Sequence, residues 1–268
     1  MSVIKYLYMC FLFLIGKAHR IQLLLNFKNK EYLKFGSVYG SKVFINNEKL
    51  NNSIVVSAGL GEDASFDIEF INKYNATVIF IDPTPRAVKH YNEIISSLGQ
   101  SSKADYNKTG KQSIKSYDLK KIQKAQLSLY SKALFNKKGN IKFFSPENKE
   151  HVSHSISSDL ISVDTQKDFI NVESNTLLNI LKELNILKEK VFLIKLDIEG
   201  AEIEVIEDIL KDKIFPHQFL IEFDDLENKN SKSVARVDKC HKLLLKNGYK
   251  LAHRLYYTEF LYVNENFK

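Results

Sequence analysis

The chain has 268 residues, of which 44% are hydrophobic and 26% are charged, a composition that suits one large buried core and excludes a disordered chain. Its net charge is +7, but the lysines are scattered among acids and asparagines, which argues against a nucleic-acid partner. The two cysteines, Cys10 and Cys240, form no CxxC pair. Neither a disulfide framework nor a zinc site is therefore predicted, and a reducing cytoplasm fits best.

An apolar run from Tyr6 to Ile15 lies near the start of the chain, flanked by Lys5 and Arg20. It is shorter than the roughly 20 residues that span a bilayer, and no small-residue cleavage site follows it. Three interpretations stay open: a helix packed on the domain or on a second subunit, an interfacial helix in peripheral contact with a membrane, and an uncleaved signal-like segment. We therefore expect an N-terminal apolar helix and lead-in segment over residues 1–50 and a main domain over residues 51–268.

From Ser53 onward, short runs rich in valine and isoleucine alternate with longer helical patterns, which predicts right-handed βαβ units. Residues 53–57 (SIVVS) and 77–81 (TVIFI) are the first two predicted strands. A helix is expected over 65–73, where apolar residues recur at helical spacing. Pro85 opens the next helix, because proline suits the first helical position and stops the preceding strand.

The same alternation continues to the end of the chain. The polar stretch 96–120 is predicted to be a long loop with a short helix, of the kind that shapes substrate sites. Segments 127–135 and 140–144 flank the residues Asn-Lys-Lys-Gly, which predicts a β-hairpin. The remaining predicted elements are helices over 177–187, 202–210 and 234–246, strands over 191–196 and 218–223, and an antiparallel pair within 249–263.

The loop after the first predicted strand has the pattern G-x-G-x-x-A, with Gly59 and Gly61 as its glycines. Asp82 ends the next strand, where a dinucleotide-binding fold places an acid. Glu62 and Asp63, however, would lie beside a helix N-terminus that receives pyrophosphate, and carboxylates repel a diphosphate. S-adenosylmethionine suits this loop better than NAD, because it carries an ammonium and a sulfonium group and no phosphate. The alternative without a ligand is a tight turn whose acids complement the helix dipole.

Three stretches of the sequence resemble the FkbM family of S-adenosylmethionine-dependent methyltransferases. They are SAGLGEDASFDIEF with VIFIDPTPRAV, then NIKFFSPENKEHVSHSI, and finally NTLLNILKEL with FLIKLDIEGAEIEVIEDIL and FLIEFDD. The resemblance covers residues 53–225 and is most specific at LIKLDIEGAE. It implies a class I methyltransferase fold: a Rossmann-like α/β sheet, mostly parallel with an antiparallel C-terminal strand, and helices on both faces. The N-terminal helical segment would be added to that fold.

The resemblance also implies roles for individual residues. Gly59 and Gly61 would line the cofactor, Asp82 with Pro83 beside it would meet the ribose, and Asp197 would face the transfer site. The methyl group would pass typically to a hydroxyl oxygen.

The chain departs from the family pattern at two positions. Many members carry an acid where this chain has Ser57, and a glutamate where it has Asp82. Aspartate serves a ribose as well as glutamate does. Glu62, with Asp63 next to it, could meet the amino group that the missing acid would bind.

Methyl transfer from a sulfonium is an in-line displacement, so the protein must align an oxygen and help remove its proton. Asp197 ends a buried strand at the edge where open α/β sheets bind ligands, which makes it the predicted base or orienting group. The alternative is that Asp197 caps the following helix. Glu199 could also reach the cleft, as could Glu222 and Asp224. Binding of Mg²⁺ or another hard cation by several such carboxylates is the alternative.

Three other side chains near these acids carry predictions. Glu202 projects into the apolar stripe of its own helix and can accept loop N–H bonds, so an anchoring role and a substrate role both stay open. Lys195, on the buried strand, is expected to pair with an acid. His154 is a candidate general base, with a structural hydrogen bond as its alternative, and His151 is a weaker candidate.

The sequence thus predicts an S-adenosylmethionine-dependent methyltransferase that O-methylates a hydroxyl on a sugar or glycoconjugate-like acceptor. The partners expected are a small molecule or glycan and no nucleic acid, with a membrane or a second copy meeting residues 1–25 as an alternative to a purely cytoplasmic protein. Two other functions stay open. One is an NAD-dependent Rossmann oxidoreductase, and the other is a catalytically silent Rossmann-like docking module.

Overall fold

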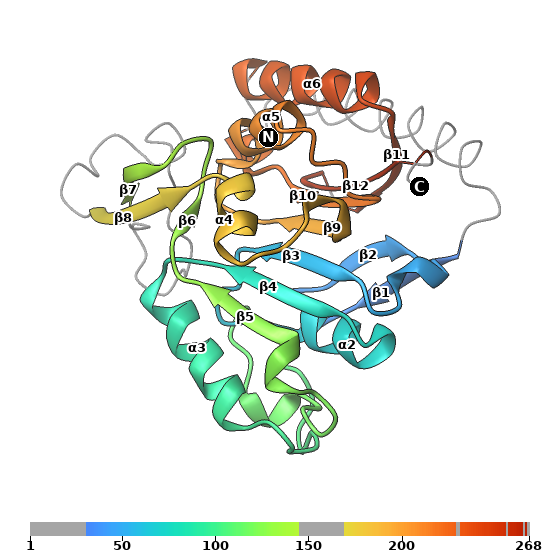
Figure 1. Cartoon of the computed structure of the whole chain (residues 1–268), viewed down its shortest axis with the longest axis vertical. Helices are drawn as coiled ribbons and strands as arrows, with labels where there is room; N and C mark the ends of the chain where they lie inside the picture. The colour runs from blue at the N-terminus through green and yellow to red at the C-terminus, as the bar shows by residue number, and fades with distance from the viewer. Residues whose placement is uncertain (1–30, 145–168, 229–230, 256, 265, 267–268) are drawn as a thin grey trace, which may run out of the picture.

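The computed structural model describes residues 31–144, 169–228, 231–255, 257–264 and 266, and its centre is a seven-stranded sheet (Figure 1). The strands are β3 (Ile54–Ala58), β4 (Thr77–Ile81), β5 (Leu127–Tyr130), β9 (Val191–Leu196), β10 (Gln218–Glu222), β11 (Tyr249–Leu255) and β12 (Glu259–Asn264). Their order across the sheet is β11-β12-β10-β9-β3-β4-β5. From β10 to β5 neighbouring strands are parallel, whereas β12 is antiparallel to both its neighbours. This order confirms the expected class I methyltransferase sheet.

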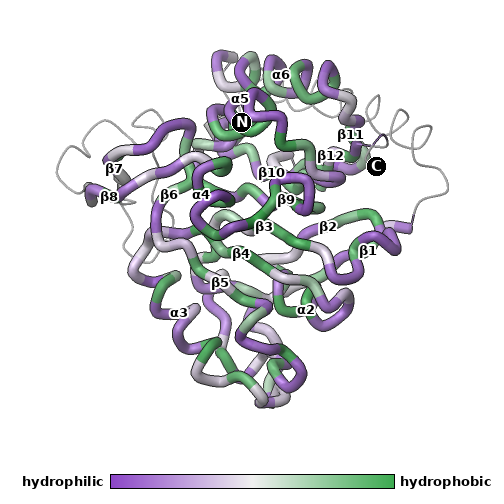
Figure 2. Tube along the Cα trace, viewed as in Figure 1, coloured by the Kyte–Doolittle hydropathy of each residue, from purple (hydrophilic) through white to green (hydrophobic). Residues whose placement is uncertain are grey.

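The central strands are apolar because both faces of the sheet are covered. All six residues of β9 are buried, and Figure 2 shows hydrophobic residues along β3 and β9. Successive side chains point to opposite faces, so Val55 belongs to one core and Val56 to the other. Continuous apolar runs bounded by polar turns are what this burial requires, and they are why these strands were predictable.

Helices cover both faces of the sheet. They are α2 (Ser65–Tyr74), α3 (Pro85–Ser96), α4 (Leu177–Glu183), α5 (Glu202–Lys211) and α6 (Ser231–Lys246). Apolar residues of α2 and α3 share the core of Val55, while those of α4, α5 and α6 share the core of Val56. Short 3-10 turns occur at Glu48–Leu50, Ile114–Ser116, Lys124–Gln126, Lys188–Lys190 and Asp224–Asn228. The helices predicted between residues 65 and 246 are all present. Only α4 ends clearly early, because Asn185 adopts a left-handed conformation with φ of 56°.

The ends of α3 follow from its sequence. Pro85 occupies the first turn, and the Thr84 side chain accepts a hydrogen bond from the Ala87 N–H at the helix start. The loop from 97 to 120 is irregular apart from the turn at Ile114–Ser116, as predicted.

The lead-in segment forms an antiparallel hairpin of β1 (Tyr32–Phe35) and β2 (Lys42–Ile45). Phe44 is fully buried and packs in the same core as α2. Gln218 on β10 fixes the hairpin, because its amide accepts from the Ile45 N–H and donates to the Ile45 carbonyl, both at 2.8 Å. This attachment brings Lys42 to the edge of the central sheet.

A separate three-stranded sheet contains β6 (Ala133–Leu134), β8 (Phe169–Asn175) and β7 (Gly139–Phe144), in that order. The predicted hairpin between 127–135 and 140–144 is therefore wrong. Residues 127–130 join the central sheet as β5, and β8 lies between β6 and β7. The Ser174 hydroxyl of β8 donates to the carbonyls of Lys137 and Gly139, so the turn is held by a strand whose place no local pattern indicated.

Several predictions fall outside the described residues. These are the apolar run Tyr6–Ile15 and both loop histidines, His151 and His154. Within the described ranges, none of the helices combines the length and the apolar character that crossing a membrane requires.

Candidate active site

A cavity of about 630 Å³ opens where the carboxyl ends of β3, β4, β9 and β10 meet. Open parallel sheets bind ligands at this edge, and the volume suits a small-molecule or cofactor site. Eight of the nine predicted site residues line it, and the ninth, His154, lies outside the described residues. The eight are Gly59, Gly61, Glu62, Asp63, Asp82, Pro83, Asp197 and Glu199.

Gly59 begins the loop after β3 and lies against the end of β9. Its φ is +84°, and a Cβ atom there would come within 1.7 Å of the Asp197 carbonyl oxygen. Only glycine fits this position, because any side chain would overlap the neighbouring backbone. Gly61 has a φ of +54° with nothing within 4 Å of its missing Cβ. The first glycine thus serves close packing, whereas the second leaves open space beside the cavity.

Asp82 closes the glycine loop from the end of β4. One carboxylate oxygen accepts the N–H groups of Leu60 at 3.0 Å and Gly61 at 2.9 Å. The other accepts from the backbone N–H and the hydroxyl of Thr84. Asp82 is only 6% exposed, so its carboxylate first shapes the loop. Its predicted contact with a ribose stays a prediction.

Glu62 and Asp63 connect the loop to distant segments. Glu62 is 3.5 Å from the Lys111 ammonium and 3.9 Å from the Arg86 guanidinium. Asp63 accepts hydrogen bonds from the Ser37 hydroxyl at 2.6 Å, the Gln112 amide and the Ser65 N–H. The two acids therefore join the lead-in hairpin, the start of α2 and the loop after α3.

Lys42 of the hairpin forms the centre of a second charged cluster. Its Nζ is 2.6 Å from Glu222, 3.1 Å from Glu259 and 3.5 Å from Asp197. Asp197 follows β9, Glu222 ends β10 and Glu259 begins β12. One buried ammonium therefore connects three neighbouring strands of the sheet. Three anions around one cation leave this side of the cavity acidic.

The sequence matches a known family over most of the chain. A family model described as the methyltransferase FkbM domain matches residues 27–251. The chain belongs to the FkbM methyltransferase family. It is accordingly an S-adenosylmethionine-dependent methyltransferase, which confirms that cofactor over NAD. Comparisons with curated proteins and with solved structures gave no match.

The cavity of this FkbM methyltransferase fits the charges of its cofactor. Gly61 leaves room beside the loop, and Glu62, Asp63 and Asp82 place negative charge around it. A diphosphate would be repelled by such a lining, whereas a ligand with an ammonium and a sulfonium is attracted. These residues would hold S-adenosylmethionine.

Asp197 is the strand-end acid of the methyltransferase that lies between two lysines. Its side chain is 31% exposed and has Lys42 on one side and Lys195 on the other. Partial burial raises its pKa, but the two ammonium groups outweigh that effect and hold the pKa below its usual range. Helix α5 is preceded by Ala201, not Asp197, at its N-cap position. Asp197 is thus an ionised group at the cavity and does not cap the helix.

The acids at and just after the end of β10 differ from Asp197 in the direction of their pKa shifts. Burial raises the pKa of Glu222, with a further increase from Asp197. Burial also raises the pKa of Asp224 well above its ordinary value, and the nearby acids Glu202 and Glu199 add to it. When neighbouring acids have pKa values shifted in opposite directions, one can stay ionised while another holds a proton.

Lys195 supports the glycine loop from below. It is 4% exposed, and its Nζ donates to the Gly59 carbonyl at 2.6 Å. Asp197 is 4.0 Å away, so the expected pairing with an acid is present at the limit of an ion pair. The stronger contact is to the backbone of the loop.

The two remaining acids of the IEGAE segment are separated as their spacing predicts. Glu199 lines the cavity, in a left-handed conformation with φ of 56°. Glu202 is fully buried, and one of its oxygens accepts the N–H groups of Ile198 and Gly200. Burial raises its pKa to about 8. The inward orientation of Glu202 is confirmed, and the contacts show it anchoring the turn that carries Glu199.

Sequence reasoning missed three residues of the site: Lys42, Glu259 and Tyr39. Tyr39 lies on the hairpin turn, 64% exposed, and lines the cavity. A Cβ atom at Gly110 would come within 2.6 Å of its ring, so Tyr39 stands against the loop after α3. Each of these residues comes from a segment that looked peripheral. The contact of Gln218 with Ile45 and the pairing of β12 with β10 bring them to the site.

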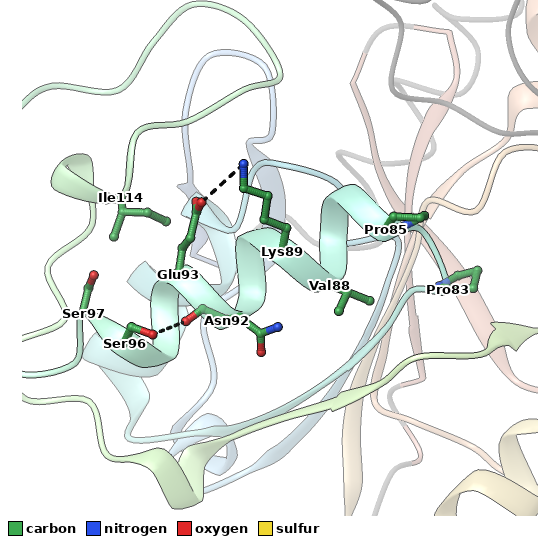
Figure 3. A pocket seen from close by; sticks show the side chains of 9 residues that line it. All are labelled: Pro83, Pro85, Val88, Lys89, Asn92, Glu93, Ser96, Ser97 and Ile114. Atoms are coloured by element: carbon green, nitrogen blue, oxygen red, sulfur yellow. Dashed lines mark hydrogen bonds and ion pairs between the residues drawn. The ribbon is translucent and has the colours of Figure 1, made fainter.

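A second hollow, of about 750 Å³, runs along the outer face of α3, where Pro83, Pro85, Val88 and Ile114 contribute to it (Figure 3). It is an open groove whose one carboxylate, Glu93, is paired with Lys89 at 3.8 Å. No charged groups converge on it as they do at the strand ends. The cavity at the carboxyl ends of the strands is therefore the candidate active site.

A metal ion has no evident place in the described part of the chain. No group of three or more histidine, cysteine, aspartate or glutamate side chains there is arranged to hold one. The strand-end carboxylates gather around the Lys42 ammonium instead. The roles of His154 and of the run Tyr6–Ile15 stay predictions.

Proposed function

We propose that this methyltransferase methylates a hydroxyl oxygen of a sugar or glycoconjugate-like acceptor, with Asp197 as the group that receives the hydroxyl. The observation that carries the proposal is the position of Asp197. Its backbone touches Gly59 of the cofactor loop, while its carboxylate faces the cavity between two lysines. The residue thus adjoins both the cofactor and the acceptor side.

Bound S-adenosylmethionine supplies an electrophilic methyl group on a sulfonium. The task left to the chain is to place an acceptor oxygen in line with that methyl group and to remove the proton from the oxygen. Asp197, kept ionised by Lys42 and Lys195, accepts a hydrogen bond from the acceptor hydroxyl and fixes its direction. An ionised acceptor beside the oxygen also strengthens it as a nucleophile.

The proton of the hydroxyl has a short route within the same cluster. Asp197 has a lowered pKa and holds a proton weakly, whereas the pKa of Glu222 is raised. Both carboxylates contact the Lys42 ammonium. As the new carbon–oxygen bond forms and the carbon–sulfur bond breaks, the proton leaves the oxygen through Asp197 and comes to rest on Glu222 or in solvent. Glu199 lines the same cavity and offers a second hydrogen-bond acceptor.

The lining of the cavity bears on the class of acceptor. On the side of β10 and β12 it includes Glu222, Asp224, Glu227 and Glu259. Such a lining repels phosphate and carboxylate groups and offers many acceptors for hydroxyl hydrogens. The ring of Tyr39 adds an exposed apolar face at the rim. Acids with an aromatic ring suit a neutral polyhydroxylated acceptor better than an anionic one.

The substitution Asp197→Asn tests the proposal, because it keeps the shape of the side chain and removes its charge. We expect methyl transfer from labelled S-adenosylmethionine to a panel of neutral glycans to fall roughly 10²- to 10⁴-fold. The affinity for S-adenosylhomocysteine, measured by isothermal titration, should change less than about threefold, since the carboxylate acts on the acceptor. Asp105→Asn, at an exposed position of the loop after α3, is the matched control and should retain wild-type activity.

Two outcomes would contradict the proposal. One is an Asp197→Asn variant that keeps wild-type turnover. The other is a product in which the methyl group is found on nitrogen or carbon instead of a hydroxyl oxygen, as mass spectrometry of the labelled product would reveal.

A further inference from the structure

Asp67, in the first turn of α2, is a buried acid that the reaction described above does not use. It is 1% exposed, and neither of its carboxylate oxygens has a hydrogen-bond partner among the described residues. It nevertheless lines the cavity. A buried carboxylate without partners is costly, and native proteins rarely keep one unless a ligand or ion completes it.

The surroundings of Asp67 leave its charge without a close cation in the described chain. Lys195 of β9 is the nearest positive group that affects it, but its Nζ is committed to the Gly59 carbonyl at 2.6 Å. Asp63, in the glycine loop, adds a second negative charge. The Ser57 hydroxyl, fully buried on β3, lies close enough to act on the Asp67 carboxylate as a donor, although the two groups do not meet full hydrogen-bond geometry.

The unpartnered atoms define what would complete the site. They are the two carboxylate oxygens of Asp67, which lines the cavity, and the hydroxyl oxygen of Ser57, which is buried close to Asp67 and is not part of the lining. A ligand group that satisfies them must carry positive charge and N–H donors. A primary ammonium has both, with three hydrogens, whereas a sulfonium carries charge but no donor hydrogen.

We propose that Asp67, assisted by Ser57, binds the α-ammonium group of S-adenosylmethionine. The inference rests on the cofactor that the family fixes and not on the acceptor proposed above. It assigns the methionine end of the cofactor to the side of the cavity that α2 covers. The sulfonium and its methyl group are then left to the side of Asp197.

The test compares S-adenosylhomocysteine with two analogues on the full-length wild-type protein by isothermal titration. The deaminated analogue lacks only the amino group, and 5′-methylthioadenosine lacks the whole amino-acid end. We expect the deaminated analogue to bind at least tenfold more weakly than S-adenosylhomocysteine. Equal affinities would overturn the proposal without any variant being made.

Asp67→Asn then shows whether this residue is the cause. The amide carries no negative charge to pair with an ammonium, so the variant should lose at least tenfold in affinity for S-adenosylhomocysteine and bind 5′-methylthioadenosine as the wild type does. The variant should also bind the deaminated analogue and S-adenosylhomocysteine about equally. Uniform weakening of all three ligands, or no weakening, would overturn the assignment.

Glu69→Gln provides the matched control on the same helix. Glu69 does not line the cavity, and its carboxylate accepts the Gly36 N–H at 3.0 Å. The control should keep the wild-type preference for S-adenosylhomocysteine. Loss of the preference in both variants would mean that the effect comes from disturbing α2 and would also overturn the assignment. Because only binding is measured, a wrong acceptor assignment would leave these results unchanged.

Discussion

The two halves of the cavity hold their carboxylates in different ways. In the cofactor half, around the loop after β3, Asp82 is held mainly by backbone N–H groups. In the acceptor half, at the ends of β9 and β10, the carboxylates of Asp197, Glu222 and Glu259 gather around the ammonium of Lys42. Both arrangements stabilise buried negative charge, but the first uses backbone dipoles and the second uses the charge of a single side chain.

The difference decides how far apart in sequence the partners lie. Asp82 is 22 residues from Leu60 and 21 from Gly61, within a single βαβ unit. Lys42 is 180 residues from Glu222 and 217 from Glu259. The cofactor half is therefore encoded locally, whereas the acceptor half exists only after the hairpin and the terminal strands have assembled on the sheet.

The largest effect is expected from Gly59→Ala, because Gly59 of the cofactor half contacts the backbone of Asp197 in the acceptor half. The new Cβ would overlap the Asp197 carbonyl oxygen at 1.7 Å, and φ of +84° is strained for any other residue. We expect loss of S-adenosylhomocysteine binding and of activity beyond detection, together with a large drop in the melting temperature.

Gly61→Ala is the control for Gly59→Ala. Its φ is also positive, at +54°, but nothing lies within 4 Å of the added atom. The expected cost is about 1–2 kcal/mol in the free energy of unfolding, from backbone strain alone. Equal damage from both substitutions, measured by urea denaturation, would show that strain and not the contact between the halves is what matters.

Lys42→Met should disable the acceptor half and spare the cofactor half. It leaves three carboxylates facing one another, and breaking a buried charge cluster typically costs about 3–5 kcal/mol. We expect kcat/KM to fall at least about 100-fold and the pKa of Asp197 to rise once Lys42 no longer lowers it. Urea denaturation measures the loss of stability, and steady-state assays at several pH values measure the fall in kcat/KM and the rise in pKa.

The control for Lys42→Met is Lys34→Met, on the other strand of the same hairpin, where the side chain is exposed. It should change the free energy of unfolding by less than about 0.5 kcal/mol. If Lys42→Met lowered the affinity for S-adenosylhomocysteine by the same factor as kcat/KM, the two halves would not be independent.

The same difference explains what the sequence could predict. The strands and helices from Ile54 to Asn264 were largely found because apolar periodicity marks buried faces and Pro85 marks a helix start. The glycine loop and Asp82 were found because they belong to one short unit. The inward orientation of Glu202 followed from helical spacing.

Features that depend on distant pairing could not be predicted in the same way. Lys42 is one of many lysines in the sequence, and nothing around it shows that Ile45 of β2 contacts Gln218 of β10. The segment after Tyr130 has the local pattern of a hairpin. Strand β8, which lies between β6 and β7 in the sheet, comes much later in the sequence, so no local pattern indicates it. Asp67 sits in an ordinary helical pattern, and only its burial beneath the loop distinguishes it.

Glu202 lies behind the acceptor half, yet its carboxyl group is held by backbone N–H groups, as the carboxylate of Asp82 is in the cofactor half. Burial raises its pKa to about 8 from an ordinary 4.5. Since the folded state favours the protonated form, its contribution to stability is complete below pH 4.5 and is lost as the pH rises to about 8.

Glu202→Gln should remove this dependence, because the amide does not titrate. The free energy of unfolding of the wild type, minus that of the variant, is expected to fall by a few kcal/mol between pH 5 and pH 8, since each pKa unit corresponds to roughly 1.4 kcal/mol. Urea denaturation at several pH values measures the difference. A difference that stays constant with pH would contradict the buried, protonated state.

Tyr39 is predicted to have the smallest effect, and it spans the two halves because it lies on the Lys42 hairpin and against Gly110. If its exposed ring packs on a sugar-like acceptor, Tyr39→Ala should raise the acceptor KM about threefold to tenfold and leave kcat within about twofold. Tyr39→Phe keeps the ring and should behave as the wild type. Equal KM increases in the two variants would assign the contact to the hydroxyl. A change in S-adenosylhomocysteine affinity instead of KM would place Tyr39 in the cofactor half.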